Sequence, residues 1–306
     1  MNDQSPAVIA CVSLDGAPSA IEYAAREALL ADAPLHIIHV LRMPAVDAYA
    51  GVYGGVLEEA DAAISEAVER ARTLTDDRVR ITAERVDDGA LITHLVRRAN
   101  LGRLVVLQHR RLSRARRMVT GSTVNAVAAK TTVPVVSVPE GWTRAHREPV
   151  VTVGIQDGQE APGLLRAGFE EARVRHARLA AIHTWWLDTD WEPSSLDQEY
   201  RADRDASTRR EFGPILDAIQ IQFPDVKASL EVWNAPPADA LMDAARESEL
   251  LVLGRRHHLL PLGSHLGPVA RAILAHGDCP VYLTPEPHRA EHHVHVRGSN
   301  ISGVMY

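Results

Sequence analysis

Two aspartates and two glycines occupy positions where a ligand could be held. Asp15 and Asp157 each follow a short apolar run, and Gly121 and Gly267 each precede a helical pattern. In open α/β sheets a ligand binds beyond the carboxyl ends of the strands, where the strand order reverses. The four residues therefore predict a binding crevice in each half of the chain. They also suit ordinary turns and helix starts, and the sequence leaves that alternative open.

Catalytic chemistry is not indicated. Ser122 precedes a helical pattern, but the G-x-S-x-G surroundings of a nucleophile elbow do not flank it. The scattered histidines have no assignable carboxylate partner of the kind that a catalytic triad needs. His39 and His183 fall within buried-strand patterns, where we expect satisfied core histidines, and His257 suits a surface loop. We therefore expect no catalytic residues and a protein that is not an enzyme.

Metal chemistry is not indicated either. The only cysteines are Cys11, inside an apolar run, and Cys279, just before another, so both are expected to pack in the core without a disulfide. The segment 286–306 shows no helical or strand periodicity and is expected to be a flexible tail. Its several histidines are suitable metal ligands, but an ordinary His-containing end is the simpler interpretation. We expect no specific metal site.

Length and charge set the class of protein. A chain of 306 residues fits two domains of about 150 residues. Its 46% hydrophobic and 24% charged residues are typical of a soluble globular protein. The absence of a long apolar run or a signal-like N-terminus predicts a cytoplasmic protein without a membrane partner. A net charge of −7 argues against general nucleic-acid binding, which needs a basic face.

An internal repeat divides the chain. The motif LHIIHV at 35–40 returns as LAAIHT at 179–184, and VPVVSV at 133–138 returns as CPVYLT at 279–284. These matches lie roughly 145 residues apart, as expected for a duplication with small loop insertions. We predict one domain at 1–140 and a second at 149–285, with the polar segment 140–149 between them.

Each half is predicted to be α/β. Short continuous runs of Val, Ile and Leu alternate with longer helical patterns, which favours buried parallel strands joined by right-handed helical crossovers. Each domain should form a five-stranded, doubly wound sheet. Ser19 and Glu22 have capping-box spacing at the start of the first helix. Gly213 and Pro214 are expected to interrupt a helix near 195–221.

The two halves resemble the universal stress protein family over about residues 6–139 and 149–285. That family has an Asp after the first strand and G-x2-G-x9-G-[ST] after the fourth. The resemblance implies a Rossmann-like, adenine nucleotide α-hydrolase-like fold that binds ATP. The glycine loop then approaches the triphosphate, the Asp holds the ribose, and the adenine rests near the second strand. It also implies that the last strands of the two halves pair, making an internal pseudo-dimer.

The first half keeps part of this pattern. Gln108 and Arg111 stand where the first two glycines belong, so the start of the loop is lost. The positions that match the family's nucleotide-binding residues are Asp15, Val40, Gly121 and Ser122.

The second half keeps a different part. His257 replaces the second glycine. Pro268 replaces the hydroxyl residue and removes an amide donor as well as an Oγ that would meet a phosphate. The positions that match are Asp157, Thr184, Gly254 and Gly267.

The missing glycines weaken the expected site. Each lost hydrogen bond to a charged phosphate costs about 1.5–3 kcal/mol, so two or three losses weaken a micromolar site roughly a hundredfold or more. Arginines at 110, 111, 114, 116 and 117 are candidates to replace those phosphate contacts, and a solvated basic loop is the alternative.

Three functions follow from the resemblance and stay open at this point. The first is an adenine-nucleotide-responsive stress module that reports ATP level through the pseudo-dimer. The second is a nucleotide-independent interaction scaffold that binds a protein partner. The third is a slow ATPase, which lacks a recognisable base or metal ligand set. Pairing of two tandem chains into a homodimer is also left open.

Overall fold

The computed structural model describes residues 5–41, 50–87, 91–109, 117–144, 148–186, 197–255 and 266–285. Within them the chain forms strands and helices in strict alternation, apart from the direct step between the two halves. The first-half strands are β1 (Val8–Val12), β2 (Leu35–Val40), β3 (Ile81–Val86), β4 (Leu104–His109) and β5 (Val135–Pro139). The second-half strands are β6 (Val150–Ile155), β7 (Arg178–Trp185), β8 (Ala228–Asn234), β9 (Leu250–Leu253) and β10 (Val281–Leu283).

Helices connect the strands within each half. Those of the first half are α1 (Pro18–Leu30), α2 (Ala50–Thr75), α3 (Leu91–Ala99) and α4 (Arg117–Ala128). Those of the second half are α5 (Ala161–Arg175), α6 (Asp197–Gln220), α7 (Pro237–Glu247) and α8 (Pro268–His276). The order β-α-β-α within each half is the one that the hydrophobic pattern predicts.

The ten strands form one sheet in the order β3-β2-β1-β4-β5-β10-β9-β6-β7-β8. Neighbouring strands are parallel within each half, which confirms two doubly wound five-stranded units. β5 and β10 pair antiparallel at the centre, with Tyr282 opposite Val136. The implied pairing of the two final strands is therefore confirmed. The strand order reverses direction between β1 and β4, and again between β6 and β9.

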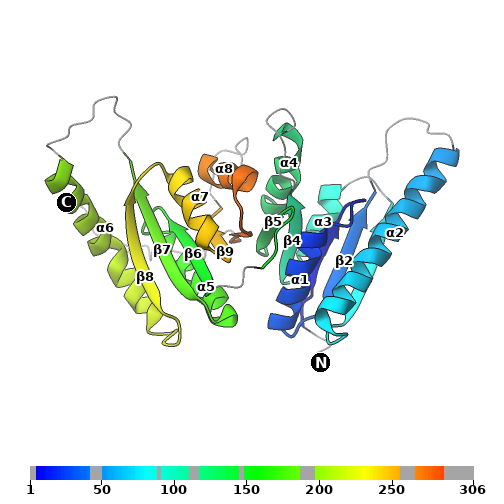
Figure 1. Ribbon diagram of the computed structural model, residues 1–306, viewed down its shortest axis with the longest axis horizontal. Helices are drawn as coiled ribbons and strands as arrows, with labels where there is room; N and C mark the ends of the chain where they lie inside the picture. Colours follow the sequence, from blue (N-terminus) through cyan, green and yellow to red (C-terminus); the bar gives the residue numbers. More distant parts are fainter. Residues whose placement is uncertain are drawn as a thin grey trace, which may run out of the picture.

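Helices cover both faces of the sheet, and each face carries a core that crosses the boundary between the halves (Figure 1). On one face α1, α2, α5 and α6 pack on the sheet through residues that include Tyr23, Phe169 and Phe212. On the other face α3, α4, α7 and α8 pack through smaller aliphatic residues such as Leu95 and Ile273. The strands are buried on both sides, which explains why their sequences are continuously apolar.

Two buried arginines of the second half reach into the first, and we call the boundary they cross the seam. On the α1 and α5 face, Arg175 forms ion pairs with Glu27 and Glu171, and its Nη2 donates to the Tyr23 hydroxyl at 2.9 Å. On the α4 and α8 face, Arg255 donates to main-chain carbonyl oxygens of the first half. Because a buried charge needs partners, these contacts tie the two halves together.

The predicted capping box at the first helix is wrong. α1 begins at Pro18, so Ser19 lies inside the first turn instead of preceding it, and Ala17 is the cap residue with a φ of 45°. Proline is favoured at the first helical position because its missing N–H has no helical partner there. That preference moves the helix start forward and removes Ser19 from the capping position.

The predicted interruption at Gly213 and Pro214 is also wrong, because α6 continues through Pro214. Phe212, Leu216 and Ile219 are buried on the same face of this helix, on both sides of the proline. Burying one such side chain stabilises by about 1.5–3 kcal/mol, so three of them outweigh the roughly 3 kcal/mol cost of an internal proline.

The described helices include none that is long and apolar enough to span a bilayer. Neither of the two described cysteines forms a disulfide. Cys279 is buried in the core, and Cys11 is partly buried and packs against it.

Candidate functional site

Asp15 lies at the carboxyl end of β1, where the first-half strand order reverses. Its side chain is exposed, and its Oδ1 accepts a hydrogen bond from the Ser13 hydroxyl. Gly16 and Ala17 both have positive φ, 76° and 45°, so the chain turns sharply between Asp15 and α1. Glycine tolerates this backbone conformation and alanine does so at a cost. The carboxylate therefore lies at the carboxyl edge of the sheet, beside the point where the strand order reverses.

The side chain of Gln108, on the neighbouring strand β4, caps the start of α1. β1 and β4 are adjacent and parallel, so the end of β4 lies beside the turn that follows β1. The Gln108 Oε1 accepts from the backbone N–H groups of Ser19 at 3.0 Å and Ala20 at 3.3 Å. These are two of the first helical amides, which have no partner within a helix. The residue that replaces the family's first glycine therefore caps a helix that is remote in sequence.

Gly121 and Ser122 lie within α4, one turn after it begins at Arg117. The sequence pattern placed both residues before the helix, but α4 begins earlier and includes them. The arginines at 110, 111, 114 and 116 fall outside the described residues, as do His257 and the tail 286–306. The structure therefore places Gly121 and Ser122 in the helix that follows β4. The ligand-binding roles predicted for them stay predictions.

Val40 and Thr184 lie at equivalent positions in the two halves, near the carboxyl ends of β2 and β7. Val40 is the buried last residue of β2 and pairs in register with Val86. Thr184 is partly buried near the end of β7 and pairs with Trp233. Both lie at the carboxyl ends of second strands, where the resemblance puts the adenine.

The histidine beside each of these residues belongs to the core. His183 Nδ1 lies 3.2 Å from the Ile155 carbonyl oxygen, which is its register partner on β6. His39 is buried opposite Val12 on β1, and its Nδ1 is enclosed without a hydrogen-bond partner among the described residues. Burial lowers the pKa of both imidazoles. The expectation of satisfied core histidines is therefore wrong for His39, which is buried but has an unpartnered Nδ1 in the described part of the chain, whereas the partly buried His183 has its hydrogen bond to Ile155.

Asp157 is held differently from Asp15. Its Oδ1 accepts from the backbone N–H groups of Gln159 at 2.8 Å and Glu160 at 3.0 Å, directly before α5. This arrangement is an Asx turn at a helix start. In the second half, therefore, the aspartate that matches the family pattern stabilises the helix start. The sequence left this alternative open for both Asp15 and Asp157.

Two glutamate side chains lie close to glycines that follow β6 and β9 in the second half. A Cβ placed on Gly254, at the end of β9, would lie 3.6 Å from Glu160 Oε2 and 3.4 Å from the Leu164 methyl carbons. A Cβ on Gly158 would lie 3.1 Å from Glu211 Oε1. Glu160 thus approaches the backbone where the resemblance puts the triphosphate, and Glu211 approaches the backbone beside Asp157, where it puts the ribose. Their charge disfavours a polyphosphate in this half.

Gly267 is the cap residue of α8, with Pro268 at the first helical position. Its φ of −63° and ψ of 167° are extended and are open to any residue. No side chain caps this helix start within the described part of the chain, which omits 256–265. Gly267 is therefore at the start of the helix, as predicted, whereas Gly121 is not.

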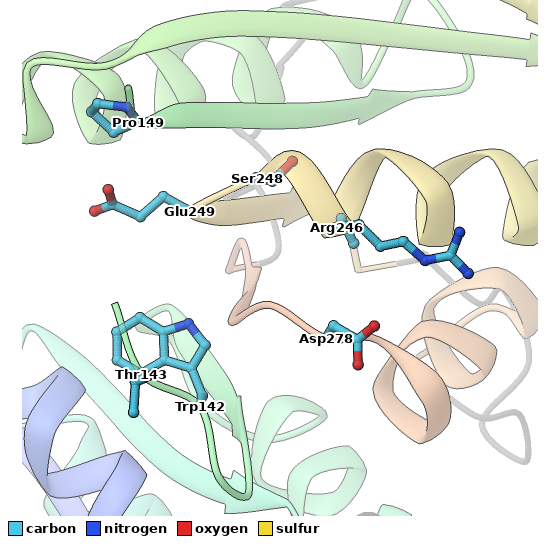
Figure 2. Close-up of a pocket in the computed structure, with 8 residues that line it drawn as sticks. Trp142, Thr143, Pro149, Arg246, Ser248, Glu249 and Asp278 are labelled. Carbon is cyan, nitrogen blue, oxygen red and sulfur yellow. The ribbon is translucent and has the colours of Figure 1, made fainter. Parts of the chain in front are cut away.

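A cavity lies at the seam, away from both crevices. Trp142, Ser248, Glu249 and Asp278 are among its lining residues (Figure 2). Glu249 and Asp278 precede β9 and β10, so the cavity is at the amino ends of second-half strands. Glu249 forms ion pairs with Arg26 and Arg175 there. Among the described residues, no group of three or more His, Cys, Asp or Glu side chains could hold a metal ion.

The comparisons with known proteins agree with this architecture. The universal stress protein family matches residues 7–139 and again residues 149–285. A universal stress protein of Mycolicibacterium smegmatis is 28% identical over 273 residues, covering 87% of this chain and 92% of that protein. One of Mycobacterium tuberculosis is 28% identical over 311 residues, covering 90% and 94%.

Solved structures show the same fold. A universal stress protein from Archaeoglobus fulgidus superposes with a TM-score of 0.62 at 12% identity, covering 93% of this chain and 100% of that one. A putative universal stress protein from Pseudomonas aeruginosa superposes with a TM-score of 0.58 at 14% identity, covering 92% and 93%. With two family matches that span nearly the whole chain, this protein belongs to the universal stress protein family as a tandem, two-domain member.

Proposed function

We propose that the first half binds an adenine nucleotide, ATP in the first instance, and that the second half does not. Asp15 accepts from the ribose hydroxyls, and the end of β2 at Val40 borders the adenine. The α4 segment with Gly121 and Ser122 borders the phosphates. Family membership supports the class of ligand, and the crevice between β1 and β4 supports the place.

The contrast between the two aspartates carries the proposal. Asp157 is engaged with the amides of Gln159 and Glu160 at its own helix start. In the first half the Gln108 Oε1 accepts hydrogen bonds from the first N–H groups of α1, and Asp15 is exposed in the turn before that helix. A carboxylate offers several acceptor positions on its two oxygens, so the exposed Asp15 can accept from a ligand hydroxyl in addition to the bond from Ser13.

The charges of the two crevices favour the same assignment. The second-half crevice presents Glu160 and Glu211 near Gly254 and Gly158. The first half also has a glutamate near its turn, since a Cβ on Gly16 would lie 4.0 Å from Glu66 Oε2, but it carries the arginine-rich sequence 110–117 directly after β4. Guanidinium groups bind phosphate oxygens in a bidentate manner and compensate for amides lost with the missing glycines.

We further infer that the module signals by occupancy without chemical turnover. The seam joins both halves through a shared sheet and two buried arginines, so a change around α4 acts directly on the second half. In a turnover assay with ATP we expect phosphate release equal to that of buffer alone, because no base is positioned among the candidate residues.

Isothermal titration calorimetry with ATP tests the proposal on the full chain. Asp15→Ala removes a charged hydrogen-bond acceptor and should weaken binding about tenfold to a hundredfold. Asp157→Ala is the matched control: it should leave the affinity unchanged and lower the stability by about 1 kcal/mol, the usual cost of a lost helix cap. Equal affinity in wild type and Asp15→Ala, or no binding at millimolar ATP, would contradict the proposal.

A nucleotide-independent scaffold is the second candidate function. Gln108 favours it, because this side chain fills a place where the family has a glycine that approaches phosphate. A scaffold predicts no thermal shift with any adenine nucleotide and no dependence of stability on ATP in any variant. A ligand-dependent rise in the melting temperature that Asp15→Ala abolishes distinguishes the first function from this one.

A further inference from the structure

We propose that the cavity at the seam binds a small organic cation, of the alkylguanidinium or alkylammonium class. The carboxylate of Glu249 accepts hydrogen bonds from the cation, and the indole of Trp142 forms an aromatic wall beside it. The lining residues that the structure describes include none of the candidate nucleotide-binding residues, so this inference does not depend on the proposed function.

The cavity is built from the second half and the segment that connects the two halves (Figure 2). Trp142, Thr143 and Pro149 come from the connecting segment after β5, and Ser248 and Glu249 come from the turn between α7 and β9. Its volume is about 90 Å³, which is small beside the roughly 300–1,000 Å³ of pockets that enclose drug-sized ligands. One charged head group with a short chain fits this space, whereas a nucleotide does not.

The carboxylate of Glu249 retains capacity to accept hydrogen bonds. Its side chain is 8% exposed, and Oε1 forms ion pairs with Arg26 and with Arg175, whose Nε lies 3.8 Å away. None of the N–H groups in the described part of the chain is aligned to donate a hydrogen bond to Oε1. The described neighbour of Oε2 is the Nε of Arg144, at 3.9 Å, beyond hydrogen-bond distance. A carboxylate that is buried in this way gains from a cationic donor.

The ion cluster behind the cavity has an excess of negative charge among the described residues. Arg175 forms ion pairs with Glu27 and Glu171 as well as with Glu249, and Arg26 pairs with Glu249. Three carboxylates thus share two guanidinium groups. Glu171 is ionised at pH 8, because its pKa is about 7. A small cation beside Glu249 therefore balances a negative charge that these residues leave in excess.

Trp142 supplies the aromatic wall. It is 8% exposed, and its ring packs edge-to-face against Tyr23 with the centroids 5.5 Å apart. The Tyr23 hydroxyl accepts from Arg175, so the cluster that holds Glu249 also holds this ring in place. Figure 2 shows the Glu249 carboxylate on the same side of the cavity as the Trp142 ring. An indole attracts a cation that lies against its face, which adds to the attraction of the carboxylate.

The remaining charges of the lining disfavour other small ligands. An anion would face both Glu249 and Asp278. The basic lining residue Arg246 is 66% exposed and is paired with Asp243 at 2.8 Å. A metal ion is not expected, because the described residues place no group of three or more His, Cys, Asp or Glu side chains together. An organic cation is the class of ligand that the lining matches.

Methylguanidinium and methylurea form a matched pair of probes, because they share a shape and only the first is charged. The indole N–H resonance of Trp142 reports binding to isotopically labelled full-length protein at pH 8, and its absence from the spectrum of Trp142→Phe identifies it. We expect saturable shifts with methylguanidinium and a roughly millimolar affinity, as is usual for so small a ligand. Methylurea should bind about tenfold more weakly or less.

Glu249→Gln tests the carboxylate. The variant keeps the shape of the side chain and removes its charge, so the affinity for methylguanidinium should fall about tenfold or more. The affinity for methylurea should change by less than about threefold. Glu247→Gln is the matched control, because this exposed neighbour does not line the cavity and its substitution changes the net charge equally. It should leave the binding of both probes unchanged.

Thr143→Trp tests the place of binding without touching the ion cluster. Thr143 is an exposed lining residue, so a large side chain there fills the opening while Glu249 stays intact. We expect loss of methylguanidinium binding with an unchanged melting temperature. This variant decides the question if Glu249→Gln does not fold.

Several results would overturn the inference. One is the absence of a saturable shift at about 50 mM methylguanidinium, and another is equal binding of methylurea. A third is wild-type affinity in folded Glu249→Gln or in Thr143→Trp. Binding of ATP to the wild type and to Asp15→Ala is a separate measurement, so the seam site and the proposed nucleotide site can fail independently.

Discussion

The guanidinium of Arg255, at the end of β9 in the second half, donates from Nη1 to the carbonyl oxygen of Thr131 in the first half at 2.8 Å. Its Nη2 donates to the Val133 carbonyl at 2.7 Å, and Nη1 also reaches Ala128, the last residue of α4. Carbonyls at a helix C-terminus lack helical partners and carry partial negative charge, which an arginine neutralises. Arg255 follows Gly254 directly, so the second-half crevice is linked to α4, the helix that borders the first-half crevice.

Replacing Arg255 should weaken the seam. Arg255→Met keeps much of the volume but leaves the carbonyl oxygens of Ala128, Thr131 and Val133 without this donor. Hydrogen bonds from a charged donor contribute about 1.5–3 kcal/mol each and are not additive, so we expect a loss of about 2–4 kcal/mol in urea denaturation. Arg72→Met, at an exposed pair with Glu69, is the control and should change stability by less than about 0.5 kcal/mol. Equal losses in both variants would contradict the role assigned to Arg255.

The seam should also make stability depend on pH through Glu171. Burial of the carboxyl, opposed by Arg175 and reinforced by Glu27, raises the pKa of Glu171 from its ordinary value of 4.5 to about 7. Between these two values the folded protein holds a proton that the unfolded chain has released. Stability from this group therefore falls as the pH rises from about 4.5 to 7.

Glu171→Gln removes that dependence. The variant should gain stability relative to the wild type as the pH rises from 5 to 8, by about 1–3 kcal/mol, when melting is followed across this range. Glu170→Gln, at the exposed neighbouring position, is the matched control and should keep the wild-type profile. A difference between Glu171→Gln and wild type that does not change with pH would show that the proton is not held there.

Pro214 offers a test of how α6 tolerates an internal proline. Pro214→Ala restores a backbone donor within the helix and should raise stability by about 1–2 kcal/mol, less than the full propensity difference because the unfolded chain also gains freedom. Pro237→Ala, at the first helical position of α7, should bring no gain because proline suits that position. Calorimetric melting of the two variants compares them directly. If Pro237→Ala stabilised the protein as much as Pro214→Ala, the position of proline within the helix would not explain the gain.

The repeat and the strands could be predicted from sequence because both are local signals. Runs such as LVVL at 104–107 and LLVL at 250–253 are apolar throughout, as strands covered on both faces must be. The pairing of β5 with β10 followed from the family resemblance alone, and its antiparallel direction comes from the structure. Pro214 was misjudged because a local helix-breaking rule competes with the burial of Phe212, Leu216 and Ile219, which only the tertiary structure shows.

The site was less predictable because its contacts join residues that are distant in the chain. Gln108 looked like a damaged glycine position, and its bonds to Ser19 and Ala20 depend on β1 and β4 being neighbours. The sequence carried no signal for Arg255, because its carbonyl partners belong to the other half. The divergence of Asp15 from Asp157 could not be seen either, because both precede similar helices.

Native mass spectrometry of the intact chain in millimolar ATP tests the central claim most directly, because it counts ligands per chain. We predict one nucleotide bound to the wild type and to Asp157→Ala, and none to Asp15→Ala. A wild-type chain that carries none or two, or an Asp15→Ala chain that keeps one, would contradict a single site in the first half.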